Sequence, residues 1–282
     1  MHDIQQQDRA PVATDRPVGG AAELRRSGFA RYRAQDLGLG PADGASAGSL
    51  ADELAAITSA FAELPPDPYA PTTNRFRRYS HAAYLPWSGE LSWIPGLPHP
   101  EYGSVTEYYQ DGHNPEYPEM QRLLPDVPAA LRESRLLEHL IRFDIEQALW
   151  LDELRRAPVY AGVHMIKLSV RDADQIAVSS PDCLHQDGGS SATFTFAHLI
   201  RCDNIVGGEN VIATPESAGR QPGELPAEAV HARFTLADPL DTYAVHDPRV
   251  SHYVAPVRLG AGPGQGERCI LIVGLAPFAP RL

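Results

Sequence analysis

The spacing of hydrophobic residues changes near residue 159. Between about 128 and 156 they recur every three or four positions, which predicts a helix with one apolar face. From 159 onward come short apolar runs, most of them separated by Gly, Pro, Asp or Asn. About eight such runs predict a β core of the sandwich, jelly-roll or barrel type. The apolar face of the helix is formed by Leu136, Leu137, Leu140, Ile141, Ile145 and Leu149.

The residues before this helix follow less regular patterns. Residues 1–20 are polar with several Pro and Gly, and we expect them to be a disordered tail. Residues 21–37 predict a short helix that Gly28 weakens. A second helix is expected to start at Ser49, whose hydroxyl can cap it, and to stop before Pro65.

Pro, Tyr and Gly are frequent in residues 65–118, which show no sustained period. This stretch predicts loops, with short strands near 75–85. We therefore expect one domain over residues 21–282, with a helical and loop-rich part over 21–158 and a jelly-roll core over 159–282. The predicted fold class is mainly β with flanking helices.

The charge balance argues against two classes of partner. Lys and Arg number 24 and Asp and Glu number 36, which gives a formal net charge of −12. Nucleic acid and anionic membrane surfaces attract basic proteins, so we expect neither and instead expect a small-molecule partner. No apolar run reaches the ~18 residues of a membrane-spanning helix. The first residues lack the apolar segment of a secretory signal, and we expect a cytoplasmic protein.

The three cysteines do not suggest a disulfide framework or a zinc site. They are few, odd in number and without Cys-x-x-Cys spacing. Cys202 and Cys269 occur in apolar, strand-like runs, where we expect buried thiols.

The segment PDCLHQDGG contains the first candidate for chemistry. His185 and Asp187 are two positions apart, so an extended backbone directs both side chains to one face. An imidazole and a carboxylate at one point suit a metal ion. Gly188 and Gly189 allow a sharp turn beside them. The alternative is a turn at a strand end, in which Asp187 caps backbone amides.

A metal site needs a third ligand, and two later histidines are candidates. His246 precedes Asp247-Pro248, which is typical of a β-turn, and His252 follows that turn at the start of a strand. Two histidines and one carboxylate on one face of an octahedron leave three positions open, as in non-haem ferrous oxygenases.

An arginine in the last predicted strand is the next candidate. Arg268 is isolated among apolar residues, where a charge needs a partner such as a bound carboxylate. Arg258, at a strand end beside a glycine-rich loop, and Lys167, within the VHMIKLSV run, are alternatives.

Five stretches, NRFRRYS, PDCLHQDGG, GGENVIAT, DPRVSHYVAPV and RCILIVGL, together resemble the iron- and 2-oxoglutarate-dependent dioxygenases. Within that family they resemble the bacterial branch that includes L-isoleucine 4-hydroxylase and related free-amino-acid hydroxylases. The stretches span about residues 74–275. The resemblance implies a double-stranded β-helix core of the jelly-roll or cupin-like type.

The resemblance also implies roles for individual residues. His185, Asp187 and His252 would bind Fe(II), which favours His252 over His246. Arg268 would bind the distal carboxylate of 2-oxoglutarate through a guanidinium fork. Dioxygen would be the co-substrate, and an aliphatic carbon of a free L-amino acid or amino-acid-derived metabolite would be hydroxylated.

Two further positions are candidates for substrate binding. Arg75, Arg77 and Arg78 form a local basic cluster, and the resemblance favours one arginine that faces the substrate; we select Arg78. Glu209 is a candidate partner for a substrate ammonium group. Two other functions stay open: desaturation or cyclisation with the same cofactors in natural-product biosynthesis, and a metal-binding jelly-roll protein without 2-oxoglutarate chemistry.

Overall fold

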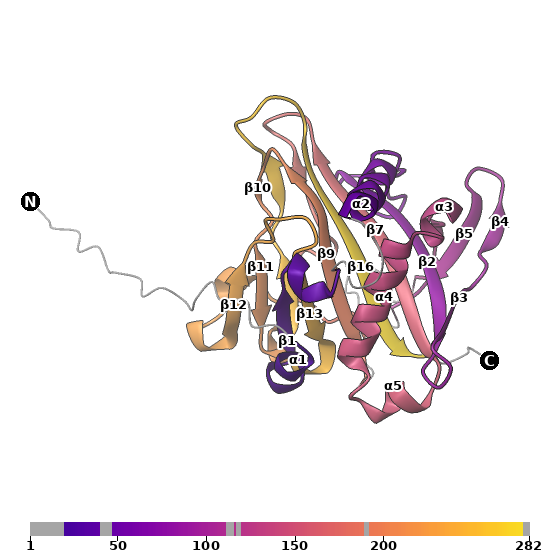
Figure 1. Ribbon diagram of the computed structural model, residues 1–282. Coiled ribbons are helices and arrows are strands. Elements are labelled where there is room, and N and C mark those ends of the chain that lie inside the picture. The colour runs from indigo at the N-terminus through magenta and orange to yellow at the C-terminus, as the bar shows by residue number, and fades with distance from the viewer. Residues whose placement is uncertain (1–19, 40–46, 111–115, 117–119, 189–191, 279–282) are drawn as a thin grey trace, which may run out of the picture.

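The large sheet of the protein has seven strands, all antiparallel to their neighbours (Figure 1). The computed structural model describes residues 20–39, 47–110, 116, 120–188 and 192–278. Across the sheet the order is β1 (Phe29–Tyr32), β13 (Thr242–His246), β9 (Phe194–Asp203), β16 (Gly266–Pro277), β7 (Val159–Val170), β2 (Arg75–Leu85) and β3 (Glu90–Trp93).

Three smaller sheets have three strands each. The first is β10 (Ile205–Gly207), β15 (Val257–Leu259) and β8 (Ile176–Ala177). The second is β12 (Val230–Phe234), β11 (Asn210–Ala213) and β14 (Ser251–Val254). The third is β4 (Leu97–His99), β5 (Gly103–Tyr108) and β6 (Arg122–Pro125). The expected double-stranded β-helix with flanking helices is confirmed.

Helices cover one face of the large sheet. They are α1 (Ala21–Ser27), α2 (Ala47–Ala62), α3 (Ala129–Arg132), α4 (Arg135–Ala148) and α5 (Asp152–Arg156). Figure 1 shows α2 and α4 lying across this sheet, where they contact strands β7, β9 and β16. The Ser134 hydroxyl accepts a hydrogen bond from the Leu137 amide and so caps the first turn of α4. No helix in the described part of the chain is long and apolar enough to cross a membrane.

Strand alternation gives the large sheet two different faces. On β7, Val163 and Met165 belong to the hydrophobic core that includes α4, and we call this side the helix face. His164 and Ile166 alternate with these two residues and line a cavity on the opposite side of the sheet. We call that side the cavity face. One strand therefore supplies both the core and the site.

The N-terminal predictions need correction. The helix expected over 21–37 ends at Ser27, because Gly28 takes the left-handed conformation (φ 79°) and the chain then enters β1. Ser49 lies inside α2, which begins two residues earlier, and is therefore not its cap. The predicted tail, residues 1–20, lies outside the described residues except for Gly20.

Two other elements differ in length from the prediction. The helix expected over 128–156 is divided into α3, α4 and α5, since the backbone leaves helical geometry at Ser134 and again near Leu151. The short strands expected near 75–85 form the continuous eleven-residue strand β2. The residues before 159 thus contribute strands β1, β2 and β3 to the large sheet.

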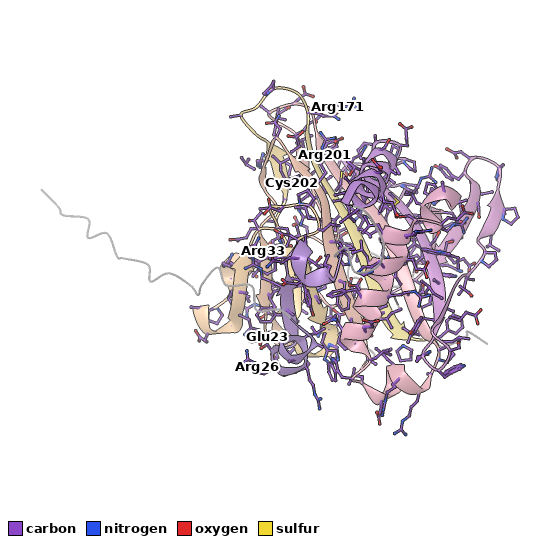
Figure 2. The ribbon with its side chains drawn as sticks, viewed as in Figure 1. Glu23, Arg26, Arg33, Arg171, Arg201 and Cys202 are labelled. Carbon is purple, nitrogen blue, oxygen red and sulfur yellow. The ribbon has the colours of Figure 1, made fainter. Side chains whose placement is uncertain are left out.

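The two cysteine predictions had different outcomes. Cys269 is buried on the helix face of β16, as expected. Cys202 is exposed, and the prediction of a buried thiol there is wrong (Figure 2). It lies in the last three residues of β9, all of which are exposed.

A buried polar network connects α4 to the large sheet. Asp144 Oδ2 lies 2.9 Å from His198 Nε2, and His198 Nδ1 lies 2.7 Å from the Thr242 hydroxyl oxygen. That hydroxyl donates to the Leu240 carbonyl at 2.9 Å, so it accepts from Nδ1–H of the imidazole. The proton between Nε2 and Asp144 is then shared by two fully buried groups.

We predict that Asp144 makes stability decrease as pH rises. Burial raises the pKa of Asp144 to about 6, so the folded state keeps a proton that the unfolded state loses near pH 4. The contribution is present below pH 4 and is lost as pH rises through 6, by about 3 kcal/mol at most. Denaturant unfolding of the wild type and Asp144→Asn at pH 4 and pH 7 measures it. Parallel pH profiles for the two proteins would contradict the assignment.

Candidate metal centre and active-site cavity

A cavity of about 800 Å³ lies against the cavity face of the large sheet. Residues of β2, β7 and β16 line one side of it, and residues of β5 and β6 another. His185, Asp187 and His252 lie in its wall. The volume is in the range of small-molecule sites.

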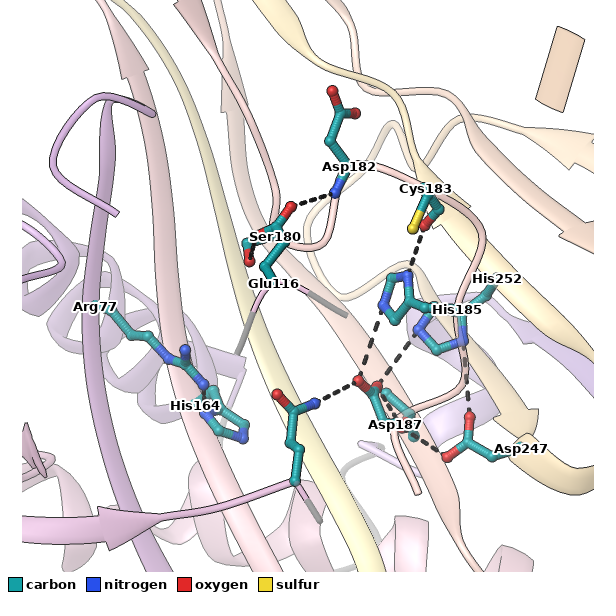
Figure 3. Close-up of polar contacts among 12 residues, drawn as sticks. Arg77, Glu116, His164, Ser180, Asp182, Cys183, His185, Asp187, Asp247 and His252 are labelled. Atoms are coloured by element: carbon teal, nitrogen blue, oxygen red, sulfur yellow. Dashed lines mark hydrogen bonds and ion pairs between the residues drawn. The ribbon is translucent and has the colours of Figure 1, made fainter. Parts of the chain in front are cut away.

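Backbone pairing brings the three candidate ligands together. His185 and His252 exchange two backbone hydrogen bonds of 2.9 Å, and their ring centroids are 4.2 Å apart. Asp187 Oδ1 lies 3.8 Å from His185 Nε2, and its Oδ2 lies 3.4 Å from His252 Nε2 (Figure 3). One donor atom from each residue falls within 4.8 Å of the others. This is the arrangement of a facial triad for iron.

The protonation of these groups suits a metal ion. His185 donates its Nδ1–H to the Cys183 carbonyl at 2.9 Å, which leaves the Nε2 lone pair directed to the site. Burial and the neighbouring His252 lower the pKa of His185 to about 4, so it is neutral at pH 7. Burial alone would raise the pKa of Asp187, but the hydrogen bond from His252 and the charges of both imidazoles hold it below its usual range. Its carboxylate also accepts from the Thr195 hydroxyl at 2.9 Å.

A second carboxylate supports His252 from behind. Asp247 is fully buried, and its Oδ1 lies 3.7 Å from His252 Nδ1, the nitrogen that faces away from the triad. Burial and the charge of Asp187 raise the pKa of Asp247. Carboxylates in this position orient metal-binding imidazoles. The sequence alone indicates only a turn at Asp247-Pro248 and does not predict this role.

His246 is not part of the site. Its ring stacks on Phe194 at 4.4 Å and meets the edge of Trp150 at 5.6 Å, in the core on the helix face. His246 is therefore a core residue, unlike the cavity-lining residues of its strand. Alternation explains the difference, since Tyr243 of the same strand lines the cavity three residues earlier.

Arg268 is buried with no hydrogen bond or ion pair to another described residue. It is 5% exposed, and burial lowers its pKa. Gly208 lies close, since a Cβ atom there would be 3.3 Å from Arg268 Cδ. The alternatives are placed elsewhere: Arg258 is exposed on β15, and Lys167 lies on the helix face, where Nζ donates to the Ala62 carbonyl at 3.2 Å. Arg268 thus offers an unneutralised cation of the kind that a carboxylate ligand requires.

The two residues selected for substrate binding do not line the cavity. Arg78 leaves β2 on the opposite side and donates to the Asp126 carbonyl at 2.8 Å. Glu209 pairs with Arg233 at 2.8 Å and is 44% exposed. In place of Arg78, its neighbours Arg75 and Arg77 face the cavity. The two-residue spacing of Arg75 and Arg77 was the available signal, because it places both on one face of a strand.

We predict that Asp247→Asn weakens metal binding by about 10- to 100-fold without removing it, because an amide is a poorer partner than a carboxyl group for the rear nitrogen of His252. A titration with Co(II), followed by its visible absorbance, measures the effect. Asp182→Asn is the matched control, since this nearby carboxylate instead accepts from the Tyr253 hydroxyl at 3.1 Å. Equal Co(II) affinity in Asp247→Asn and the wild type would refute the role.

Comparisons with known proteins agree with this geometry. A bsmA homolog from Methylobium petroleophilum matches with a TM-score of 0.71 at 19% identity, covering 95% of this chain and 98% of that one. IDO from Bacillus thuringiensis matches with a TM-score of 0.67 at 19% identity, covering 92% and 98%. The Fe(II)/α-ketoglutarate-dependent dioxygenase TqaL matches with a TM-score of 0.66 at 14% identity, covering 91% and 85%. These likenesses establish the fold.

No curated protein is a significant match in sequence. The sequence profile of the family described as 2OG-Fe dioxygenase, however, matches residues 58–274. This range covers most of the chain and contains the His185–Asp187–His252 triad and Arg268. The chain therefore belongs to the 2OG-Fe dioxygenase family.

Proposed function

We propose that the protein hydroxylates an aliphatic carbon of a free L-amino acid or an amino-acid-derived metabolite. The observation that carries the proposal is the composition of the cavity wall. The triad shares one cavity with aliphatic side chains on β14 and β16, including Val254 and Ile272, and with guanidinium groups on β2 and β6. An apolar wall suits an alkyl side chain, and cations suit a carboxylate.

The protein supplies position, charge and a dry environment for the reaction. Iron at the triad, with 2-oxoglutarate and dioxygen, supplies the oxidising chemistry. His185 is neutral and Asp187 is ionised, which suits a divalent ion. Burial would lower the pKa of His252, but its hydrogen bond to Asp187 and the charge of Asp187 raise it, so a metal ion would displace a proton from His252 Nε2. The aliphatic side chains would hold a C–H bond near the metal and exclude water from it.

Arg268 is the proposed partner of the distal carboxylate of 2-oxoglutarate. Its guanidinium is buried and has no acidic partner among the described residues, a costly arrangement unless an anion binds. Two parallel hydrogen bonds from the guanidinium would match the two carboxylate oxygens.

A likeness to an amino acid dioxygenase also supports the substrate class. IDO from Bacillus thuringiensis is an isoleucine dioxygenase, and it shares the fold over nearly the whole of this chain. Family membership contradicts the alternative of a metal-binding protein without 2-oxoglutarate chemistry.

We predict that Arg268→Ala weakens 2-oxoglutarate binding by about 10- to 100-fold, since a charge-assisted carboxylate contact is lost. Anaerobic titration of the Fe(II)-loaded protein with 2-oxoglutarate, followed by the metal-to-ligand charge-transfer band, gives the affinity. Arg258→Ala, an exposed arginine on β15, is the matched control and should behave as the wild type does. If Arg268→Ala binds 2-oxoglutarate as tightly as the wild type does, another cation binds the distal carboxylate. No band in the iron-loaded wild type would overturn the proposed function.

We predict that the product of an aliphatic L-amino acid gains one oxygen atom. Incubation with Fe(II), 2-oxoglutarate and single amino acids, followed by mass spectrometry, tests this outcome. Matched runs without 2-oxoglutarate are the control. A product that has instead lost two hydrogen atoms would show desaturation or cyclisation and would contradict hydroxylation.

A further inference from the structure

A cluster of cations and aromatic rings forms one wall of the cavity. Arg77 of β2 and Arg122 of β6 both lie over the ring of Tyr108 at the end of β5, with guanidinium carbons 4.8 and 4.5 Å from the ring centroid. Both arginines are at most 5% exposed, although both line the cavity. Three segments distant in sequence thus bring two guanidinium groups to the same ring.

Three arginines of this part of the molecule, Arg75, Arg77 and Arg122, lie near one carboxylate, that of Asp67, among the described residues. The Asp67 carboxylate hydrogen-bonds Arg75 at 2.9 Å and lies 3.9 Å from the nearest terminal nitrogen of Arg77. Burial and the charges of Arg77 and Arg75 lower the pKa of Arg122, and the opposing effect of Asp67 does not compensate. Buried like charges are unfavourable until an anion approaches them.

His164 lies beside Arg77 and is uncharged. Its Nδ1 lies 2.8 Å from a terminal nitrogen of Arg77 and accepts a hydrogen bond from it. Burial and the charge of Arg77 hold the pKa of His164 well below its usual range, so the imidazole is neutral. The buried Nε–H of Arg77 has no hydrogen-bond partner in the part of the chain that the structure describes. Arg77 therefore has one donor that no described residue satisfies.

Gln110 connects this wall to the metal centre. Its side-chain oxygen accepts from Arg122 at 2.5 Å, and its side-chain nitrogen donates to Asp187 Oδ1 at 3.2 Å. An amide oxygen is neutral and is a weaker partner for a guanidinium than a carboxylate is. A carboxylate would therefore bind Arg122 more strongly than the Gln110 amide oxygen does.

We propose that Arg122, assisted by Arg77, binds the carboxylate of the substrate, and that this carboxylate displaces the Gln110 amide oxygen and thereby loosens its contact with Asp187. The inference rests on the proposed function and narrows it. A free amino acid offers the required carboxylate, whereas an amino acid within a peptide or a C-terminal amide does not. Substrate binding is then transmitted to a metal ligand through one side chain.

Calorimetric titration of the anaerobic Fe(II)–2-oxoglutarate complex of the full chain tests the site. The probes are L-isoleucine and L-leucine, each compared with its primary amide. In the wild type, each acid should bind at least about tenfold more tightly than its amide, because a charge-assisted contact is lost in the amide. Arg122→Gln should remove this preference. Arg78→Gln, on the opposite side of β2, is the matched control and should keep it.

Two substitutions of Gln110 test the displacement. Gln110→Ala removes the competitor and should tighten binding of the acids about threefold or more, whereas Gln110→Glu places a carboxylate beside Arg122 and should weaken it at least about tenfold. A merely structural role would weaken binding in both variants. Circular dichroism of each variant checks that it is folded.

The outcomes separate this inference from the proposed function. Equal binding of acids and amides, a preference that survives Arg122→Gln, or no binding of either acid overturns the carboxylate site. If Gln110→Ala and Gln110→Glu both weaken, or both tighten, binding of the acids, the proposed displacement of Gln110 is wrong. Absence of the charge-transfer band in the same wild-type samples overturns the proposed function instead.

Discussion

The metal centre depends on one backbone pairing between segments that are distant in sequence. His185 and His252 exchange hydrogen bonds as an isolated antiparallel bridge, which places both imidazoles on one side of the paired backbone. Asp187 reaches the same point because it lies two residues after His185 in an extended segment. Side-chain contacts then set orientation: the Cys183 carbonyl selects the tautomer of His185, and Asp247 faces the rear nitrogen of His252. The bridge therefore fixes the positions of the metal ligands. The contacts with the Cys183 carbonyl and with Asp247 orient the two imidazole rings.

The large sheet supports this centre because its two faces have different roles. Residues that point to the helix face form an apolar core with α2 and α4, and their neighbours in the strands line the cavity. A shift of one residue in register would exchange the two sets and would move His164 or Tyr243 into the core. Long strands resist such a shift, because β7 and β16 pair along their whole length. The rigidity of the site thus follows from the length of the strands.

The metal ligands were predictable, because spacing within short segments carries their signal. The His-x-Asp pair, the later histidine and the strand-borne arginine each require only local extended geometry. Arg122 and Gln110 lack such a signal, since their meeting with Asp187 depends on how β5 and β6 pack beside β2. Arg78 was selected from the basic cluster without the strand register, and only the register shows that Arg75 and Arg77 face inward. The start of one helix was also missed: Ser49 has the chemistry of a cap, but α2 begins at Ala47.

The separation of the cations has a consequence for selectivity. A 2-oxoglutarate molecule and an amino acid both carry carboxylates, so a single cationic patch would bind either one. Arg268 lies on β16 near Tyr243, whereas Arg122 lies on β6 beside Tyr108, so the two proposed carboxylate sites are on different sheets. The charge of Asp187 acts on both Tyr243 and Tyr108, which places the metal ligand near each of these rings. A ligand that chelates the metal and reaches Arg268 leaves Arg122 available, and a second carboxylate can then enter without competing for the first site. Charge placement would in this way keep the two anions at separate sites near the metal centre.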